Sequence, residues 1–237
     1  MVRCGDFHLM ESMDEGGVQV RDVSRYHVHE GYNYPNYDIS VLVMKTKFQA
    51  STFIRPICLE NLIQVDSTDG VIVLGWGMDR HGEHEMELNI AKLKILDPDY
   101  CKEVVEAVTG FGDDLLCAID QALGGSGSCF GDSGGPVFAF NSIQRRYELK
   151  GLVSGGAVPG QCGAFGAPDI FTRTSFDNIY RWISKKTEDK SRVQNKGEEG
   201  EKSKSDEEDD SYHPNPQKDD CEKKFTSERL QALFCKT

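Results

Sequence analysis

Apolar and polar positions alternate in short runs over the first 183 residues, and Gly, Pro, Asn and Asp separate these runs. In YDISVLVMK (37–45), Ile39, Val41 and Val43 fall on one face of a predicted strand. Further β-rich runs are GVIVLGWG (70–77), YELKGLVSG (147–155) and DIFTRTSF (169–176). Many short strands with turns between them predict an all-β barrel or sandwich.

Two segments depart from the strand pattern and predict helices, at 97–110 and 175–186. Asp97 or Asp99 would cap the first of them. The pattern changes again at 187–220, which holds twelve acidic and six basic residues, a net charge of −6. Such a segment buries too little apolar surface to offset its ordering entropy, which predicts a disordered acidic linker.

Charge and cysteine content narrow the function classes. A net charge of −12 argues against nucleic acid as a partner, and no apolar run is long enough to span a membrane. Eight scattered cysteines without a Cys-x-x-Cys pair favour disulfides over zinc or redox sites, and so a secreted, extracellular protein. The first residues, MVRCGDFHLM, lack the apolar stretch of a signal peptide, which conflicts with that compartment.

The motif that carries chemistry is SCFGDSGGPVF, residues 128–138. Its glycines let backbone N–H groups crowd around one point, so the amides of Gly131 and Ser133 could both donate to an oxyanion. A Gly-rich hairpin with a capping aspartate is the alternative. We favour an activated serine, because GDSGGP is a long and specific match.

This motif and several others, in the same order along the chain, resemble the chymotrypsin-like (trypsin-fold) serine endopeptidases over about residues 2–185. The matching segments are YDISVLVM, FIRPICL (53–59), GWG (75–77), GLVSGG (151–156) and PDIFTRT followed by YRWI. The resemblance implies a double six-stranded β-barrel, here with an incomplete first barrel, a C-terminal helix and then the acidic tail. It also implies proteolysis of protein or peptide substrates through an acyl-enzyme.

Residue by residue, the resemblance makes Ser133 the nucleophile, Asp38 the triad aspartate and Ser154 its support. The oxyanion hole would be formed by Gly131 and Ser133. The expected divisions are a partial first barrel (1–60), the second barrel with the C-terminal helix (61–186), the acidic linker (187–220) and a short, weakly helical C-terminal segment (221–237).

The same resemblance implies two disulfides, Cys101–Cys117 and Cys129–Cys162, the second of which would brace the specificity pocket. Cys58 resembles a cysteine that in many family members binds a segment upstream of the protease domain, and a buried free thiol is the alternative. Three internal pairings stay open for the remaining cysteines, which are Cys4, Cys58, Cys221 and Cys235.

A serine hydroxyl needs a histidine within hydrogen-bond reach to take its proton. In the family that histidine precedes the triad aspartate in an Ala-Ala-His-Cys type of segment, and residues 2–9 already resemble the strand after it. We expect no replacement base among the histidines present, which are His8, His27, His29, His81, His84 and His213. We therefore expect a fragment of a longer protein, or an incomplete gene model, with the signal peptide, the base and a partner for Cys58 upstream.

The resemblance also describes the substrate pocket. Gly127 stands where trypsin-like members have an aspartate, Asp169 lies on the opposite wall, Ser128 adds a hydroxyl and Gly156 keeps the entrance open. Crab collagenase-like members resemble this combination and accept several side-chain types. The hypothesis is broad specificity that includes basic residues, and the alternative is that Asp169 pairs with a neighbour and only stiffens the wall.

Three further points on cofactors and on function stay open. No cofactor and no catalytic metal are expected, although a loop with Asp6, Glu11, Asp14 and Glu15 resembles a calcium loop of some relatives, with a solvated acidic loop as the alternative. The alternative function is a protease-like binding or regulatory protein without catalysis. A third hypothesis makes the acidic tail an interaction arm for a basic partner.

Overall fold

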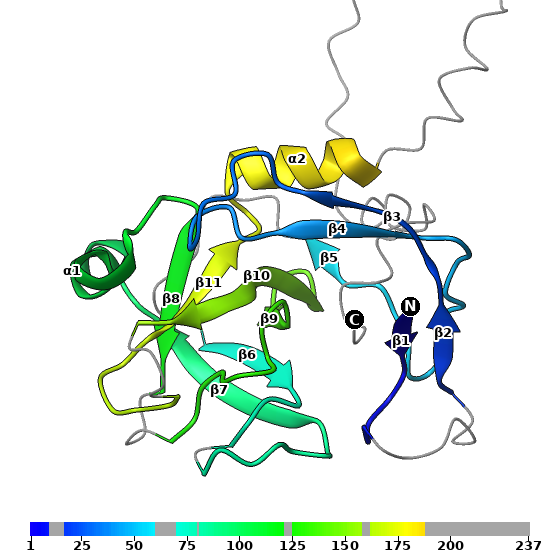
Figure 1. Ribbon diagram of the computed structural model, residues 1–237, viewed down its shortest axis with the longest axis horizontal. Coiled ribbons are helices and arrows are strands. Elements are labelled where there is room, and N and C mark those ends of the chain that lie inside the picture. Colours follow the sequence, from blue (N-terminus) through cyan, green and yellow to red (C-terminus); the bar gives the residue numbers. More distant parts are fainter. Residues whose placement is uncertain (10–16, 60–69, 80, 121–124, 158–161, 188–237) are drawn as a thin grey trace, which may run out of the picture.

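The computed structural model describes residues 1–9, 17–59, 70–79, 81–120, 125–157 and 162–187 (Figure 1). Its strands and helices are β1 Val2–Cys4, β2 Gln19–Arg21, β3 Val23–Val28, β4 Ser40–Met44, β5 Cys58–Leu59, β6 Gly70–Gly75, β7 Asn89–Ile95, α1 Pro98–Thr109, β8 Leu115–Ile119, β9 Pro136–Asn141, β10 Arg146–Gly156, β11 Asp169–Arg173 and α2 Asp177–Thr187. Thr187 therefore ends a helix. The rest of the acidic linker and the segment 221–237 lie outside the described residues, and the domain boundaries stay predictions.

Six strands form one closed antiparallel barrel, in the order β11-β8-β7-β6-β9-β10, and the pairing of β10 with β11 closes it. Alternate side chains of these strands point inward, as the period of two requires. Val71 and Ala139, which the resemblance places where many family members have a disulfide, are both buried in this core beside Phe171. The all-β barrel prediction is confirmed.

The N-terminal strands form two separate two-stranded sheets, β1–β2 and β3–β4. No further strand pairs with either sheet in the portion of the chain that is described, which agrees with the predicted incomplete first barrel. The predicted inner face of β4 is confirmed, because Ile39, Val41 and Val43 are buried against Leu149 and Trp182. This cluster joins β4 to the barrel and to α2.

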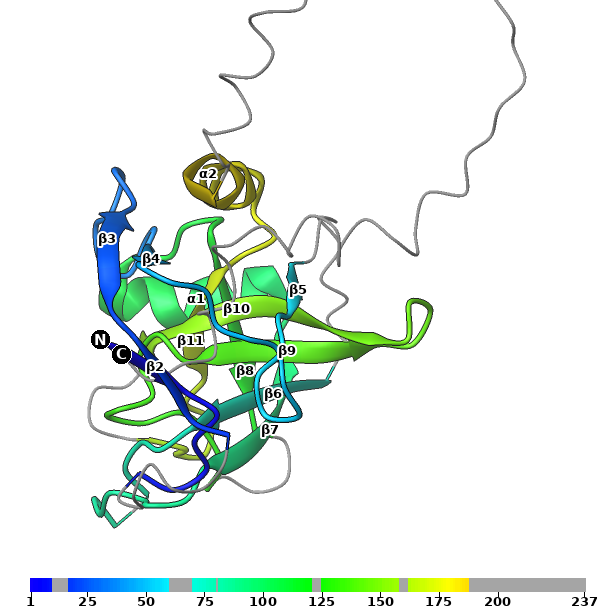
Figure 2. The same ribbon diagram turned by 90° about the vertical axis from the view of Figure 1, so that its right-hand side faces the viewer.

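Both predicted helices are present, and each has a local cause. Asp97 caps α1, since its carboxylate accepts hydrogen bonds from the N–H groups of Asp99 and Tyr100, and Asp99 is not the cap. Helix α2 buries Ile179 and Ile183 and lies along the outside of the molecule beside β3 and β4 (Figures 1 and 2). Neither described helix combines the length and apolar character of a membrane span.

The cap on α1 predicts a measurable stability change. Asp97→Ala leaves two N–H groups of the first turn without their acceptor, and we expect a loss of about 1 kcal/mol in the free energy of unfolding. Urea denaturation followed by circular dichroism measures it, with the exposed Glu103→Ala in the same helix as a control. Equal stability of the two variants would contradict the assignment of the cap.

Candidate active site

Ser133 lies on a tight turn that leads into β9. The N–H of Gly135 donates to the carbonyl of Asp132 (2.8 Å), and the N–H of Gly134 donates to the carbonyl of Val153 in β10 (2.8 Å). Gly134 has a φ of 78°, a conformation that side chains rarely allow. The glycines of GDSGGP thus fold the turn and fix the serine beside the barrel.

The amides expected to form the oxyanion hole lie on this turn. Gly131 has a φ of 103°, and it precedes Asp132 and Ser133. Within the described ranges, the N–H groups of Gly131 and Ser133 donate to no other residue. Two donors without a protein acceptor are what stabilisation of an oxyanion requires, and Ser133 itself is exposed.

Asp38 is held by two strands of the closed barrel, although it belongs to the N-terminal part of the chain. The hydroxyl of Ser154 in β10 donates to Oδ2 of Asp38 (2.8 Å). The hydroxyl of Thr172 in β11, which is fully buried, donates to the main-chain carbonyl of Asp38 (2.8 Å). The family resemblance implied the contact with Ser154, whereas Thr172 carried no signal in the sequence, because nothing distinguishes this threonine within a β-rich run.

Asp38 and Ser133 line one open cavity of about 840 Å³. Its floor is apolar and is formed by Leu149, Leu152 and Val153 of β10. None of the described residues around this cavity is a histidine. A base that takes the proton of Ser133 must therefore enter the cavity from elsewhere.

The histidines of the described residues have other surroundings. His29 stacks on Tyr37 with ring centroids 4.6 Å apart, its Nδ1 accepts the N–H of Gly31, and burial lowers its pKa. His8 lies 3.9 Å from a carboxylate oxygen of Glu87. No histidine in the described part of the chain hydrogen-bonds to Ser133 or Asp38.

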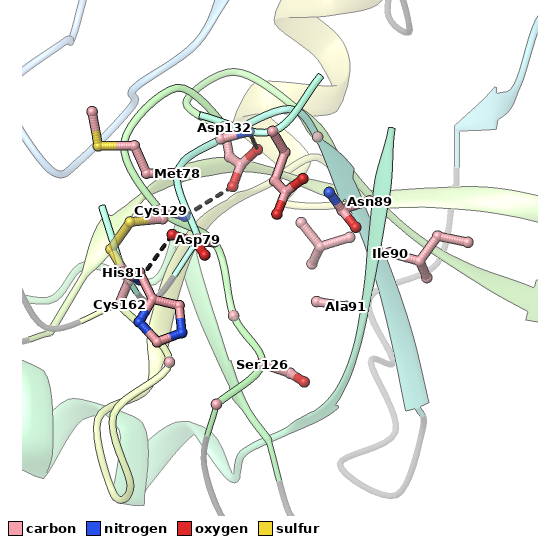
Figure 3. A pocket seen from close by; sticks show the side chains of 17 residues that line it. Met78, Asp79, His81, Asn89, Ile90, Ala91, Ser126, Cys129, Asp132 and Cys162 are labelled. Carbon is pink, nitrogen blue, oxygen red and sulfur yellow. Dashed lines mark hydrogen bonds between the residues drawn. A yellow bond between two sulfur atoms is a disulfide. The ribbon is translucent and has the colours of Figure 1, made fainter. Parts of the chain in front are cut away.

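The carboxylate of Asp132 lies beneath the serine turn and accepts two backbone hydrogen bonds, from Gly77 (2.8 Å) and Cys129 (2.9 Å). The second bond is drawn in Figure 3. A Cβ on Gly75 or Gly77 would lie 1.7 or 2.3 Å from an oxygen of this carboxylate, so both glycines of GWG are needed there. Burial raises the pKa of Asp132. No basic side chain pairs with it in the described residues.

A smaller cavity of about 330 Å³ adjoins Asp132 (Figure 3). Its other walls include Met78, Asn89, Ile90 and Gly127. The family resemblance implies that an N-terminal ammonium pairs with this aspartate. A half-buried carboxylate with only neutral donors around it has the surroundings that such a cation would suit.

Asp169, expected on the pocket wall, is buried at the start of β11. Its Oδ2 accepts the N–H of Ser128 (2.7 Å), and a Cβ on Gly127 would lie 3.0 Å from the same oxygen. Burial raises the pKa of Asp169 to about 7, while the bonds from Ser128 act in the opposite direction. The structure thus brings together Gly127, Ser128 and Asp169, with Gly156 opposite Asp169 across the β10–β11 pair.

One neighbour of this pocket was not predicted. The hydroxyl of Tyr34 lies 2.5 Å from where a Cβ on Gly155 would stand, so the tyrosine fills space that a side chain at 155 would take. Members of the family that the sequence resembles often have Trp at this position. Here the position is a glycine, and the Tyr34 hydroxyl takes the space beside it. Tyr34 carried no signal in the sequence, because its loop has no regular pattern.

Two disulfides are described, one beside the serine turn and one between α1 and β8. Cys129 before the serine turn bonds to Cys162, and Cys101 of α1 bonds to Cys117 of β8, the two pairs that the resemblance implies. Cys4 and Cys58 are also disulfide-bonded, so a free thiol at Cys58 is wrong.

The suggested calcium loop lies mostly outside the described residues. Asp6 is described and forms an ion pair with Arg3. The other acids of that loop, Glu11, Asp14 and Glu15, are not described. Calcium binding therefore stays a prediction.

Comparison with known proteins finds one family and several related proteases that the chain resembles. The sequence profile of a family described as Trypsin matches residues 1–183. The chain is 31% identical over 191 residues to Limulus clotting factor C of Carcinoscorpius rotundicauda, a match that covers 76% of this chain and 18% of that protein. It is 33% identical over 172 residues to transmembrane protease serine 11B of Homo sapiens, covering 70% and 39%. It is 29% identical over 182 residues to coagulation factor XII of Sus scrofa, covering 71% and 29%. The chain thus spans less than two fifths of the length of these relatives.

The raised pKa of Asp169 predicts how stability changes with pH. The unfolded carboxyl ionises near pH 4, whereas the folded one keeps its proton to about pH 7, so the folded state binds more protons in this window. Its free energy of unfolding should therefore fall relative to Asp169→Asn as the pH rises from about 4 to 7, by up to about 1.4 kcal/mol per unit. Urea denaturation across this range measures it.

The control for this experiment is Asp99→Asn, which changes an exposed carboxyl in the first turn of α1. Its stability should run parallel to that of the wild type at every pH. If Asp169→Asn also runs parallel to the wild type, the carboxyl is not held in its protonated form by burial.

Proposed function

Because the chain belongs to the trypsin family of serine peptidases, we propose that it hydrolyses peptide bonds of protein substrates through an acyl-enzyme on Ser133. The observation that carries this proposal is that Ser133 and Asp38 face the same cavity, with Asp38 held by Ser154. The general base is an imidazole from outside the described residues, placed between the serine hydroxyl and the aspartate.

The chemistry follows from this placement. The imidazole takes the proton of Ser133 Oγ as the oxygen attacks the carbonyl carbon, and Asp38 stabilises the imidazolium that forms. The N–H groups of Gly131 and Ser133 donate to the oxyanion. The imidazolium then gives its proton to the leaving amine, and water hydrolyses the ester on Ser133 by the reverse sequence of proton transfers.

Substrate choice is a second part of the proposal. A carboxylate beside Gly127 and Ser128 attracts a cationic side chain when it is ionised, and leaves a neutral pocket when it is protonated. We therefore propose a pocket that accepts several side chains and prefers Lys or Arg only above the pKa of Asp169. The hydrogen bond to Ser128 supports the competing role, a stiffened wall.

The proposal also covers where the domain works, inside or outside the cell. Every described cysteine is disulfide-bonded, and disulfides persist in oxidising surroundings. Among the relatives are a clotting factor and a transmembrane protease by name. We propose that this domain works outside the cell.

One observation favours a second function. The cavity that holds Ser133 and Asp38 has no histidine among its described residues, and without a base the serine is a poor nucleophile. A protease-like module that binds protein without cleaving it is therefore the alternative.

Imidazole added in solution distinguishes the two functions. The cavity is open and large enough for this small base, so we expect it to accelerate labelling of Ser133 by a fluorophosphonate at least about tenfold, since a positioned base contributes roughly 10²–10⁴-fold. Labelling is followed by mass spectrometry, with N-methylacetamide, which has no basic nitrogen, as the matched additive.

Two variants sharpen the result. Ser133→Ala should lose the label entirely, and Asp38→Asn should keep slow labelling but lose most of the response to imidazole. Circular dichroism establishes that each variant is folded. Folded wild-type protein that gains no Ser133-dependent label with imidazole would favour the binding function over the enzyme.

Benzamidine, a planar cation, tests the pocket without catalysis. We expect its dissociation constant to fall about tenfold between pH 6 and pH 8, because a carboxyl with a pKa of about 7 goes from mostly protonated to mostly ionised in that interval. Asp169→Asn should bind weakly at both pH values, and Asp99→Asn should behave as the wild type. Affinity that is independent of pH in the wild type would leave Asp169 with a structural role only.

A further inference from the structure

Asp38 lies at the centre of a tight turn of the main chain. The N–H of Ile39 donates to the carbonyl of Tyr37 (2.8 Å), and this bond closes a three-residue turn around Asp38. Tyr37 has a φ of 51°, in the left-handed region that a bulky side chain rarely adopts. Such a conformation persists only where the surrounding structure holds it. The direction in which Asp38 points therefore depends on what holds Tyr37.

Asp114 makes the contact that holds Tyr37. Its Oδ2 accepts the N–H of Tyr37 at 2.5 Å, although the two residues are 77 positions apart in the sequence. Asp114 is buried and comes directly before β8, and its own carbonyl accepts the N–H of Arg173 at the end of β11 (2.7 Å). The carboxylate is thus fixed to the closed barrel and not to the loop that it holds.

The same side of the barrel holds the other end of this dipeptide. Thr172 of β11 pairs with Leu115 of β8, which runs beside it (Figure 1), and the hydroxyl of Thr172 donates to the carbonyl of Asp38. The N–H of Tyr37 and the carbonyl of Asp38 are therefore both bound to the barrel. Only four rotatable backbone angles lie between these two groups, so the bond from Cα to Cβ of Asp38 keeps one direction.

Further contacts complete the surroundings of Tyr37 and Asp114. The ring of Tyr37 stacks on His29, with centroids 4.6 Å apart and 10° between the ring planes. A Cβ on Gly112 would lie 2.2 Å from Oδ1 of Asn36 and 2.5 Å from Oδ1 of Asp114, so the glycine lets the two loops approach. Burial raises the pKa of Asp114, while the hydrogen bond from Tyr37 acts in the opposite direction and favours the ionised carboxylate.

We infer that Asp114 is a positioning residue for the reaction at Ser133, because it holds Tyr37 in the left-handed conformation and so directs the carboxylate of Asp38 into the larger cavity. Asp114 does not line that cavity and acts only through Asp38. Asp38 is then oriented twice, by Ser154 at its carboxylate and by Asp114 through the main chain. The catalytic consequence rests on the proposed function, whereas the hold on the turn does not.

Hydrogen exchange of single amides, followed by NMR on the full chain, tests the hold on the turn. In the wild type, the N–H groups of Tyr37 and Ile39 should both be protected. In Asp114→Ala both should exchange at least about tenfold faster, since the bond from Ile39 closes the turn that Asp114 holds. The matched control is Asp113→Ala, which changes the exposed neighbour of Asp114 and should leave both amides protected.

A conservative variant identifies the hydrogen bond as the cause. Asp114→Asn keeps a side-chain oxygen that can accept the N–H of Tyr37, so it should exchange as the wild type does. Exchange like that of Asp114→Ala would overturn the role of this acceptor. An unprotected Tyr37 amide in the wild type overturns the inference without any variant, and so does an Ile39 amide that stays protected in Asp114→Ala.

Labelling of Ser133 by the fluorophosphonate tests the effect on catalysis. The acceleration by imidazole should fall from about tenfold in the wild type to about twofold or less in folded Asp114→Ala, because a displaced Asp38 no longer orients the imidazolium. Asp113→Ala and Asp114→Asn should keep the full acceleration. Full acceleration in Asp114→Ala together with faster exchange at Ile39 overturns the positioning role. If imidazole does not accelerate labelling of the wild type, the proposed function fails, and the exchange data alone decide whether Asp114 holds the turn.

Discussion

Two hydrogen bonds to one residue, Asp38, connect the N-terminal strands to the chemistry of the barrel. Ser154 fixes its carboxylate and Thr172 fixes its main chain, each at 2.8 Å and each from a strand that closes the barrel. Buried hydroxyls aimed at one acceptor orient it at small entropic cost, because the strands that carry them are already rigid. The position of the aspartate relative to Ser133 therefore depends on the barrel rather than on the two small sheets.

The second constraint on this site is a pair of acidic side chains that form no ion pair with a basic residue of the described ranges. Asp132 is half-buried beside the serine turn and Asp169 is buried at the start of β11. Each accepts backbone N–H groups, and burial raises the pKa of each. The charge of Asp132 also raises the pKa of Asp169, since like charges at short range disfavour the charged form. A cation that enters either cavity, whether a substrate side chain or a terminal ammonium, relieves this repulsion. Ligand binding and stability are thus linked through the same carboxyls.

The sequence predicted those features that depend on local periodicity or on a dense motif. Alternation over 37–45 fixed the buried face of β4, and the glycines of GDSGGP indicated the turn that holds Ser133. Thr172 and Tyr34 could not be found this way, since their roles arise from strands and loops that meet only in the folded chain. The cap of α1 was only partly predictable. The sequence offered Asp97 and Asp99 on either side of Pro98, and the backbone geometry of the folded chain selects Asp97.

Stability and catalysis make opposite demands on the larger cavity. Its lining includes apolar side chains, and covering them would be favourable. Each Å² of apolar surface removed from water contributes about 25 cal/mol to the free energy of folding. Catalysis needs the same opening free, since substrate and base must both reach Ser133. A segment that only covers the hollow satisfies the first demand at the expense of the second, and a segment that brought its own histidine would satisfy both. What occupies this hollow therefore decides whether the domain acts as an enzyme or as a binding module, more than any residue already inside it.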